Sequence, residues 1–356
     1  MKTILITAST LSPVGIDTIL SLKDFYRIIC ADVKSRNESI SYYFCKQYYE
    51  VPLAKEATEY IDKIAKICDK EKVDIILPLT IEEIFVLLTN NDFFANKGIR
   101  IANGNDLDII TTCSDKWLTN KFLRNRGIHV PNAIPVFNTS DIKNNIEKLG
   151  YPEKRVVIKP RVTHGSRGFK IITSKESDLS LIIDTKPNDF HFINQDYFCD
   201  VLKNKNIRML LMDYLEGDDY SVYIFCINGK PRIILPMKRL GLIPGMSTGG
   251  VLEKNEGIMS YVKEISRAFK FNGAVNLQLK DTPAGPLLYE INTRISATTV
   301  ITRGTDINFP LCEALLSEGK DGHVDEHISR ATILWGLKLH RIHREIYQYG
   351  DTFYEK

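Results

Sequence analysis

The first 110 residues alternate between short apolar segments and segments with helical spacing, and this alternation constrains the fold more than any other feature. Helix 58–70, for example, carries Ile61, Ile64, Ala65 and Cys68 at helical spacing. Further helices are predicted at 15–22 and 81–90, and strands at 3–7, 27–31 and 73–78. Strands that alternate with helices predict a parallel sheet covered by helices, so the first part of the chain is expected to be α/β.

After residue 110, the mixture of helix and strand patterns predicts an α+β region in two lobes. Ser114 is predicted to cap a helix that runs to Arg126 and stops at Gly127, and another helix is expected at 139–149. Segments 155–160 and 168–173 are expected to pair as antiparallel strands around a glycine-containing loop. Further strands are predicted at 209–215, 220–227, 231–237, 273–280 and 285–292, with a helix at 258–269.

Length, charge and cysteine content exclude several classes of protein. A chain of 356 residues suggests two or three packed units. The net charge of +3 gives no electrostatic basis for nucleic-acid binding, and no apolar run is long enough to cross a membrane. No signal peptide precedes the first predicted strand, and the seven cysteines are odd in number without a Cys-x-x-Cys pair. A cytoplasmic protein with reduced thiols is therefore expected.

The most informative residues lie in the last two predicted strands. Glu290 and Asn292 must share one sheet face, because strand side chains alternate with period two. Gln278 joins them if the two strands are adjacent and antiparallel. Three oxygen-bearing side chains suit Mg²⁺, or Mn²⁺, and Arg294 would place a permanent cation beside a transferring phosphoryl group. The alternative is a polar, solvent-facing side of a strand pair.

A second set of residues predicts a phosphate site. Lys159 ends an apolar strand and is followed by a loop with Gly165, Ser166 and Gly168. Backbone N–H groups can approach phosphate oxygens closely where side chains are small, and the lysine adds a point charge. A surface hairpin with an incidental lysine is the alternative interpretation.

Three further segments are candidates for nucleotide or substrate contacts. The apolar strand before Asp213 runs into an acidic turn and then into another strand, which fits either a hinge between lobes or an ordinary acidic turn. Segment 237–250 contains Lys238 and several glycines, and is either a closing lid or a flexible surface loop. Arg303 is predicted either to anchor a substrate carboxylate or to pair with Asp306.

At these residues the sequence resembles the ATP-grasp superfamily, most closely its carbamoyl-phosphate-synthetase-like branch. Gln278 lies twelve positions before Glu290, the spacing at which family members carry their first metal ligand. The resemblance implies a Rossmann-like (pre-ATP-grasp) parallel-sheet domain and two α+β lobes that clasp ATP. It sets domains at 1–112, 113–208 (small lobe) and 209–356 (large lobe with the metal site).

The resemblance also implies roles for individual residues. The phosphates of ATP would be bound by Lys116 and Lys159, with the 163–168 loop closing over them. Adenine and ribose would be held by Asp213, Tyr214, Leu215 and Asp219, although Asp219 replaces the more usual glutamate. Gln278, Glu290 and Asn292 would bind magnesium, and Arg294 would steady the acyl phosphate. Independently of the resemblance, the residues themselves make Lys238 a candidate contact for the γ-phosphate or the substrate carboxylate, and Arg303 a candidate for the substrate carboxylate.

The implied activity is ATP-dependent ligation of a carboxylate to an amine through an acyl phosphate. The substrates are expected to be small molecules, with no nucleic-acid or membrane partner, and a homodimer is the default oligomer. Carboxyphosphate chemistry on bicarbonate and a non-catalytic ATP-binding regulator are the alternatives. The opening segment 7–15 lacks a Gly-x-Gly-x-x-Gly fingerprint, so dinucleotide binding is not predicted there.

Overall fold

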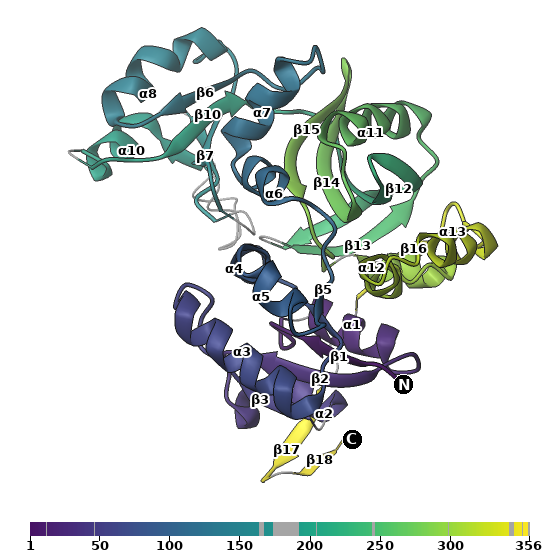
Figure 1. Cartoon of the computed structure of the whole chain (residues 1–356). Helices are drawn as coiled ribbons and strands as arrows, with labels where there is room; N and C mark the ends of the chain where they lie inside the picture. The colour runs from purple at the N-terminus through teal and green to yellow at the C-terminus, as the bar shows by residue number, and fades with distance from the viewer. Residues whose placement is uncertain are drawn as a thin grey trace.

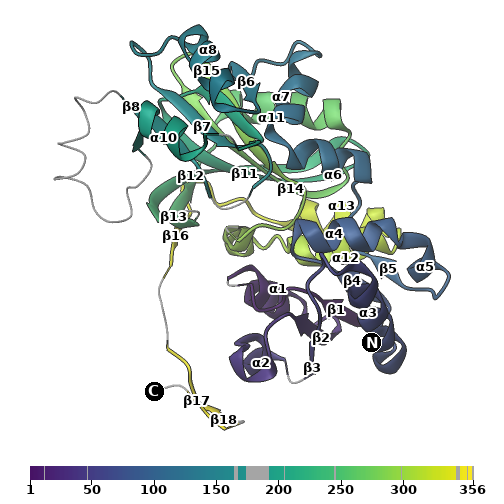
Figure 2. The same ribbon diagram turned by 90° about the vertical axis from the view of Figure 1, so that its left-hand side faces the viewer.

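The described residues form three large β-sheets, one in a first domain and two in a pair of lobes above it, and a fourth sheet of only two strands (Figures 1 and 2). The computed structural model describes all residues except 12, 46, 164–166, 174–191, 204, 244–245, 298, 342–344, 351 and 355–356.

The first sheet confirms the parallel α/β domain. Its strand order is β3-β2-β1-β4-β5, and every described pairing is parallel. The strands are β1 (Thr3–Ile6), β2 (Arg27–Asp32), β3 (Tyr48–Glu50), β4 (Ile75–Leu77) and β5 (Arg100–Ile101). The helices are α1 (Val14–Leu22), α2 (Ser41–Phe44), α3 (Ala57–Glu71), α4 (Ile81–Thr89) and α5 (Asn91–Ala95). Consecutive residues of the central strands β1, β2 and β4 are buried, such as Ile4, Leu5 and Ile6. Both faces of these strands are therefore covered, as expected for a parallel sheet with helices on both sides.

Two short helices lead from this domain into the lobes, and here one prediction is wrong. α6 (Leu107–Ser114) precedes α7 (Lys116–Arg124), and the cap of α7 is Asp115. The Asp115 carboxylate accepts from the backbone N–H groups of Trp117 and Leu118. Ser114 does not cap, because its hydroxyl donates to the Ile110 carbonyl within α6 at 2.7 Å.

The second sheet forms the small lobe, with strand order β6-β10-β7-β8-β9. Its strands are β6 (Ala133–Val136), β7 (Val156–Pro160), β8 (Lys170–Thr173), β9 (Phe192–Asn194) and β10 (Met209–Asp213), and its helices are α8 (Thr139–Asn145) and α10 (Gln195–Val201). β7 and β8 are antiparallel, as predicted. β10 pairs with β6 and β7, so it belongs to this sheet although the predicted boundary at 208/209 assigns it to the large lobe. The other domain boundaries remain predictions.

The third sheet forms the large lobe and is antiparallel throughout, in the order β15-β14-β11-β12-β13-β16. Its strands are β11 (Asp218–Ile227), β12 (Lys230–Ile243), β13 (Met246–Leu252), β14 (Gly273–Thr282), β15 (Gly285–Asn292) and β16 (Lys338–His340). α11 (Glu256–Phe269) packs on one face, where Ile258, Val262 and Ile265 meet Val222, Ile224 and Leu277.

The opposite face of this sheet turns toward the first domain. Tyr223 and Phe225 share one core with Ile4 and Ile6 of the parallel sheet, together with residues of α12 (Phe309–Ser317) and α13 (Asp321–Arg330). A 3₁₀ helix, η4 (Thr299–Thr305), lies beside α1 in the same region. The first domain and the large lobe are therefore packed together rather than joined only by a linker.

A C-terminal hairpin, β17 (Tyr347–Tyr349) and β18 (Thr352–Tyr354), ends the chain against the first domain. The Phe353 ring lies 5.9 Å from Tyr42 and 5.4 Å from Tyr43. No described helix has the length and apolar character needed to cross a membrane.

Candidate active site

The predicted metal residues come together on one face of β14 and β15. The two strands are antiparallel, with Gln278 opposite Glu290 and Asn276 opposite Asn292. Asn292 Nδ2 donates to Glu290 Oε1 at 3.1 Å. The structure thus brings Gln278, Glu290 and Asn292 into one row of oxygen-bearing side chains, which we call the oxygen row.

Asn276 belongs to the same row and was missed by the sequence analysis. It lies two residues before Gln278, so strand alternation alone would have found it. Its side chain is buried, and its Oδ1 has no hydrogen-bond partner within the described part of the chain. A buried oxygen without a partner is costly, and a cation ligated there would remove the cost.

The donors of the oxygen row fit magnesium. The described residues contain no group of three or more His, Cys, Asp or Glu side chains able to hold a metal. The row instead offers one carboxylate and three amide oxygens, which suits a hard cation that keeps several waters and shares substrate phosphates. A soft or redox-active metal would require other ligands.

Two lysines face Glu290 from the small lobe and from α7. Lys116 Nζ lies 4.0 Å from Glu290 Oε2 and donates to the Thr163 carbonyl at 2.8 Å. Lys159 Nζ donates to the Tyr289 carbonyl at 3.3 Å. Both side chains are buried, and Lys116 lies too far from the Glu290 carboxylate for a strong ion pair.

Burial controls the charge of these lysines. The pKa of Lys159 is lowered to about 7, mainly by desolvation and to a smaller extent by repulsion from the Lys116 cation. Attraction to the Glu290 carboxylate opposes this lowering only in part. Desolvation also lowers the pKa of Lys116, against the attraction of Glu290 and Asp115. A site that holds two amines with lowered pKa values is prepared for an anion that would restore their charge.

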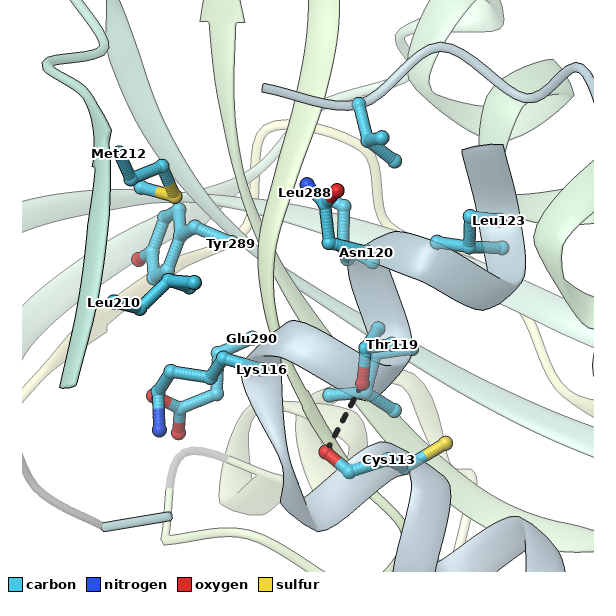
Figure 3. Close-up of a pocket in the computed structure, with 12 residues that line it drawn as sticks. Cys113, Lys116, Thr119, Asn120, Leu123, Leu210, Met212, Leu288, Tyr289 and Glu290 are labelled. Atoms are coloured by element: carbon cyan, nitrogen blue, oxygen red, sulfur yellow. Dashed lines mark hydrogen bonds and ion pairs between the residues drawn. The ribbon is translucent and has the colours of Figure 1, made fainter. Parts of the chain in front are cut away.

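A pocket lies where the two lobes meet, and Figure 3 shows its lining. Leu210 and Met212 of β10 lie beside the Tyr289 ring, and the ends of Lys116 and Glu290 lie together. The apolar part of the lining is suited to a flat ring, whereas the charged end is suited to phosphates.

The predicted hinge joins the two lobe sheets through residues 214–217. Asp213 ends β10, and its carboxylate accepts from Asn132 N–H at 2.9 Å. The Tyr214 N–H bonds to the Arg155 carbonyl, and Leu215, like Tyr289, packs against the buried group that contains Leu210 and Met212. Gly217 has φ +128°, and a Cβ there would meet the Asp281 carbonyl oxygen at 2.1 Å, so the hinge requires glycine.

A β-bulge at Tyr289 shapes the site in a way that the sequence did not indicate. Leu279 is opposite Leu288 and Gln278 is opposite Glu290, which leaves Tyr289 without an opposite partner. Its hydroxyl donates to Asp219 Oδ1 at 2.8 Å and accepts from Arg239 Nη1 at 3.2 Å. Bulges re-aim side chains next to active sites, and this one turns Tyr289 toward the same face as Glu290.

Asp219, predicted to contact ribose, lies between two cations. Arg239 Nη1 is 3.5 Å from Asp219 Oδ1, and Lys280 Nζ is 3.6 Å from Asp219 Oδ2. Arg239 is held further by Ser247, whose hydroxyl accepts from Nε at 2.6 Å.

Lys238 is the predicted catalytic residue that the structure places elsewhere. It lies opposite Tyr220 on β11, on the face that packs against α11, and its Nζ pairs with Asp218 at 2.6 Å. Its neighbour Arg239 points to the oxygen-row face instead, because adjacent strand residues face opposite sides. Segment 237–250 was interpreted as a lid or loop, but its described residues belong to the paired strands β12 and β13.

The other predicted residues are distributed as follows. Arg294 lies just beyond β15 and is partly buried. Desolvation lowers its pKa, and the negative charges of Glu290 and of Glu82 on α4 oppose that lowering. Arg303 Nη1 pairs with Asp17 of α1 at 3.9 Å, rather than with Asp306. Gly168 has φ +73° in the turn between β7 and β8, whereas Gly165 and Ser166 lie outside the described residues.

Three family models match the chain, and together they extend over most of it. "ATP-grasp in the biosynthetic pathway with Ter operon" matches residues 205–337. "RimK-like ATP-grasp domain" matches 113–215, and "PylC-like, N-terminal domain" matches 12–102.

Curated relatives include carbamoyl phosphate synthase large chains. The protein from Agathobacter rectalis is 25% identical over 212 residues, which is 56% of this chain and 18% of that protein. One from Clostridium botulinum (strain Kyoto) is 24% identical over 264 residues, or 71% of this chain and 22% of that protein. The chain therefore spans about a fifth of the length of these relatives.

Solved structures with the same fold include a biotin carboxylase from Campylobacter jejuni, with a TM-score of 0.66 at 14% identity, covering 89% of this chain and 71% of that one. An L-amino acid ligase from Bacillus licheniformis has a TM-score of 0.65 at 14% identity, covering 93% and 78%. N5-carboxyaminoimidazole synthetase from Staphylococcus aureus, complexed with ADP, has a TM-score of 0.66 at 14% identity, covering 90% and 78%.

The three matching models, the curated relatives and the shared fold agree with the arrangement of the two lobes around the oxygen row. The chain belongs to the ATP-grasp superfamily of ATP-dependent ligases, in its carbamoyl-phosphate-synthetase-like branch.

Proposed function

We propose that the chain ligates a small-molecule carboxylate to an amine, with ATP as the energy source and Mg²⁺ (or Mn²⁺) as the metal. The carboxylate attacks the γ-phosphate of ATP and releases ADP. The amine then attacks the acyl phosphate, which gives an amide and phosphate. The superfamily supports the reaction class, whereas the two substrates of this chain are part of the proposal.

One observation carries the proposal: the oxygen row faces two buried lysines across the junction of the lobes. Adenine binding alone would need neither a carboxylate among three amide oxygens nor two amines with lowered pKa values. A phosphate chain between the row and the lysines would satisfy both sides at once. This arrangement supports catalysis over a purely regulatory role.

We assign the following roles to the residues of the site. Lys116 and Lys159 bind phosphate oxygens, and burial strengthens these contacts by excluding water. Magnesium, held by the oxygen row, would neutralise charge on the phosphates. Arg294 steadies the transferring group from beside Glu290. The apolar lining formed by Leu210, Met212 and Tyr289 would hold the adenine ring.

The test is a phosphate-release assay with ATP, Mg²⁺ and pools of carboxylates and amines. We expect release that requires both a carboxylate and an amine, and a loss of at least about 100-fold in Glu290→Gln. Glu264→Gln, on the exposed face of α11, is the matched control and should retain full activity. If Glu290→Gln retains wild-type release, the proposal fails.

The similarity to carbamoyl phosphate synthases favours carboxyphosphate chemistry as a second candidate. The same assay separates the two, because release with bicarbonate and no other carboxylate would support the second candidate. Tight ATP binding without release under any condition would support a non-catalytic regulator.

Localisation and oligomeric state also remain proposals. We propose a cytoplasmic enzyme, in agreement with seven cysteines that are all free and buried. A homodimer remains the default expectation, to be measured by light scattering.

A further inference from the structure

An asparagine side chain in the linker between the first domain and the lobes contacts the backbone next to the oxygen row. Asn103 lies in the linker that leads from β5 to α6 (Figure 1), and its Nδ2 donates to the Thr293 carbonyl at 2.9 Å. Thr293 stands between Asn292, the last residue of β15, and Arg294. Asn103 is 9% exposed and Thr293 is 1% exposed, so water competes little for this hydrogen bond.

The Thr293 carbonyl accepts this hydrogen bond at the point where the strand ladder stops. β14 begins at Gly273, but its first residue paired with β15 is Asn276, opposite Asn292. β15 is also the edge strand of its sheet. Within the described chain, the sheet therefore supplies no further pairing for the backbone after Asn292, and Asn103 provides a hydrogen bond in its place.

A second asparagine holds Asn103 and the linker in position. The Asn105 N–H donates to Asn103 Oδ1 at 3.1 Å, and the Asn272 N–H donates to Asn105 Oδ1 at 3.0 Å. Asn272 directly precedes β14, and a Cβ on Gly104 would lie 3.0 Å from its carbonyl oxygen. The linker is thus bound both to the start of β14 and to the end of β15, at one end of the large-lobe sheet.

The first domain also acts on Arg294. The carboxylates of Glu290 in the oxygen row and of Glu82 on α4 both attract its guanidinium. Arg294 Nη1 donates to the Ile295 carbonyl at 3.0 Å. The guanidinium therefore lies between charges of the two domains, and the backbone that carries it is the segment that Asn103 binds.

We propose that Asn103 is a positioning residue of the active site, whose amide fixes the backbone between Asn292 and Arg294. The inference rests on the proposed function and deepens it, because the linker from the first domain becomes part of the support for the metal ligands. The Thr293 hydroxyl is buried and has no hydrogen-bond partner among the described residues, so its own side chain does not fix this backbone. Hydrogen bonds that orient metal ligands commonly change metal affinity or activity about 10- to 100-fold when they are removed.

The first test measures metal binding, which does not require turnover. Mn²⁺ is titrated into wild type and Asn103→Leu by electron paramagnetic resonance, with a non-hydrolysable ATP analogue present. Leucine has nearly the volume of asparagine but no donor, so the Mn²⁺ affinity and kcat should each fall about 10- to 100-fold. The affinity for the analogue without metal should stay within about twofold of wild type.

Asn308 provides a matched control, because its Nδ2 donates to a carbonyl across the same domain boundary. Its partner is Ser21 of α1, at 2.6 Å, and its Oδ1 caps α12 by accepting from the Leu311 N–H. Asn308→Asp keeps the cap and removes the donor. It should lower the Tm and leave the Mn²⁺ affinity and kcat unchanged, which is also the result expected of Asn103 variants if Asn103 were only an interdomain latch.

A pH profile of Asn103→Asp tests the donor itself. A protonated carboxyl can donate to the Thr293 carbonyl, whereas a charged carboxylate cannot, and burial raises the pKa of a carboxyl. The kcat of this variant, divided by that of wild type at the same pH, should therefore fall as the pH rises from about 6 to about 9, while the ratio for Asn308→Asp stays flat.

The inference is overturned if Asn103→Leu keeps the wild-type Mn²⁺ affinity, if Asn308→Asp loses as much Mn²⁺ affinity as Asn103→Leu, or if the Asn103→Asp ratio does not fall. If Asn103→Leu does not fold, Asn103→Asp at high pH takes its place in the metal titration. If no carboxylate stimulates phosphate release in wild type, the proposed function fails, and the Mn²⁺ titration then decides the inference alone.

Discussion

ATP binding should be coupled to proton uptake through Lys159, and the size of the effect follows from its pKa. Burial and the nearby Lys116 cation lower that pKa to about 7 in the ATP-free chain. Phosphate oxygens beside the amine would return the pKa toward its usual value near 10.4, because an opposite charge favours the charged form. Binding must therefore protonate whatever fraction of Lys159 is neutral beforehand.

That fraction is about one tenth at pH 6, about half at pH 7 and about nine tenths at pH 8, for a pKa near 7. We expect uptake of about 0.9 proton from Lys159 on binding at pH 8, where a terminal phosphate with a pKa near 6 is already ionised. The affinity for ATP should fall about tenfold for each pH unit above 8, since one pKa unit corresponds to about 1.4 kcal/mol.

Isothermal titration in buffers of different ionisation enthalpy measures the proton count directly. Lys159→Arg is the informative variant, because arginine keeps the cation but does not titrate in this range. We expect it to remove the Lys159 share of the uptake while Lys116 still contributes its own. Equal proton uptake by wild type and Lys159→Arg at pH 8, or release rather than uptake, would refute the reasoning.

Three further outcomes follow from the contacts described above. Asp115→Ala should lower the free energy of unfolding by at least about 2 kcal/mol in urea, because it removes both the cap of α7 and the carboxylate that pairs with Arg161, whereas Ser114→Ala should change it by less than about 0.5 kcal/mol. Arg239→Ala should lower kcat/KM by about tenfold or more, whereas Lys238→Ala, on the opposite face, should stay within about twofold of wild type. Burial raises the pKa of Glu313 to about 8, so the folded chain retains a proton that the unfolded chain loses above about pH 4.3. The contribution of Glu313 to stability therefore falls between about pH 4.3 and 8, and Glu313→Gln should gain stability relative to wild type across that window in urea denaturation.

Much of the fold was accessible from the sequence because local patterns determined it. The strand–helix alternation predicted the parallel sheet, and β1, β2 and α3 lie within a residue or two of their predicted ranges. The adjacency of the last two predicted strands was also predictable, because only a short turn separates them, whereas the pairing of Gln278 with Glu290 depends on the bulge at Tyr289. These features depend on periodicity and chain length rather than on distant contacts.

Other features depend on packing that a sequence does not display. Asp115 and Ser114 are both good capping residues, and only the end of α6 decides which one caps α7. The faces of Lys238 and Arg239 could not be assigned, because alternation separates adjacent residues without saying which side meets α11. The bulge at Tyr289 depends on the register of β14, so its link to Asp219 had no sequence signal.

Metal binding measured by electron paramagnetic resonance tests the central claim most directly. Mn²⁺ is titrated into wild type and Glu290→Gln in the presence of a non-hydrolysable ATP analogue. We expect the affinity for the metal–nucleotide complex to fall at least about tenfold in the variant, and the variant to keep the wild-type Tm. Unchanged Mn²⁺ affinity in correctly folded Glu290→Gln would show that the oxygen row does not hold the metal.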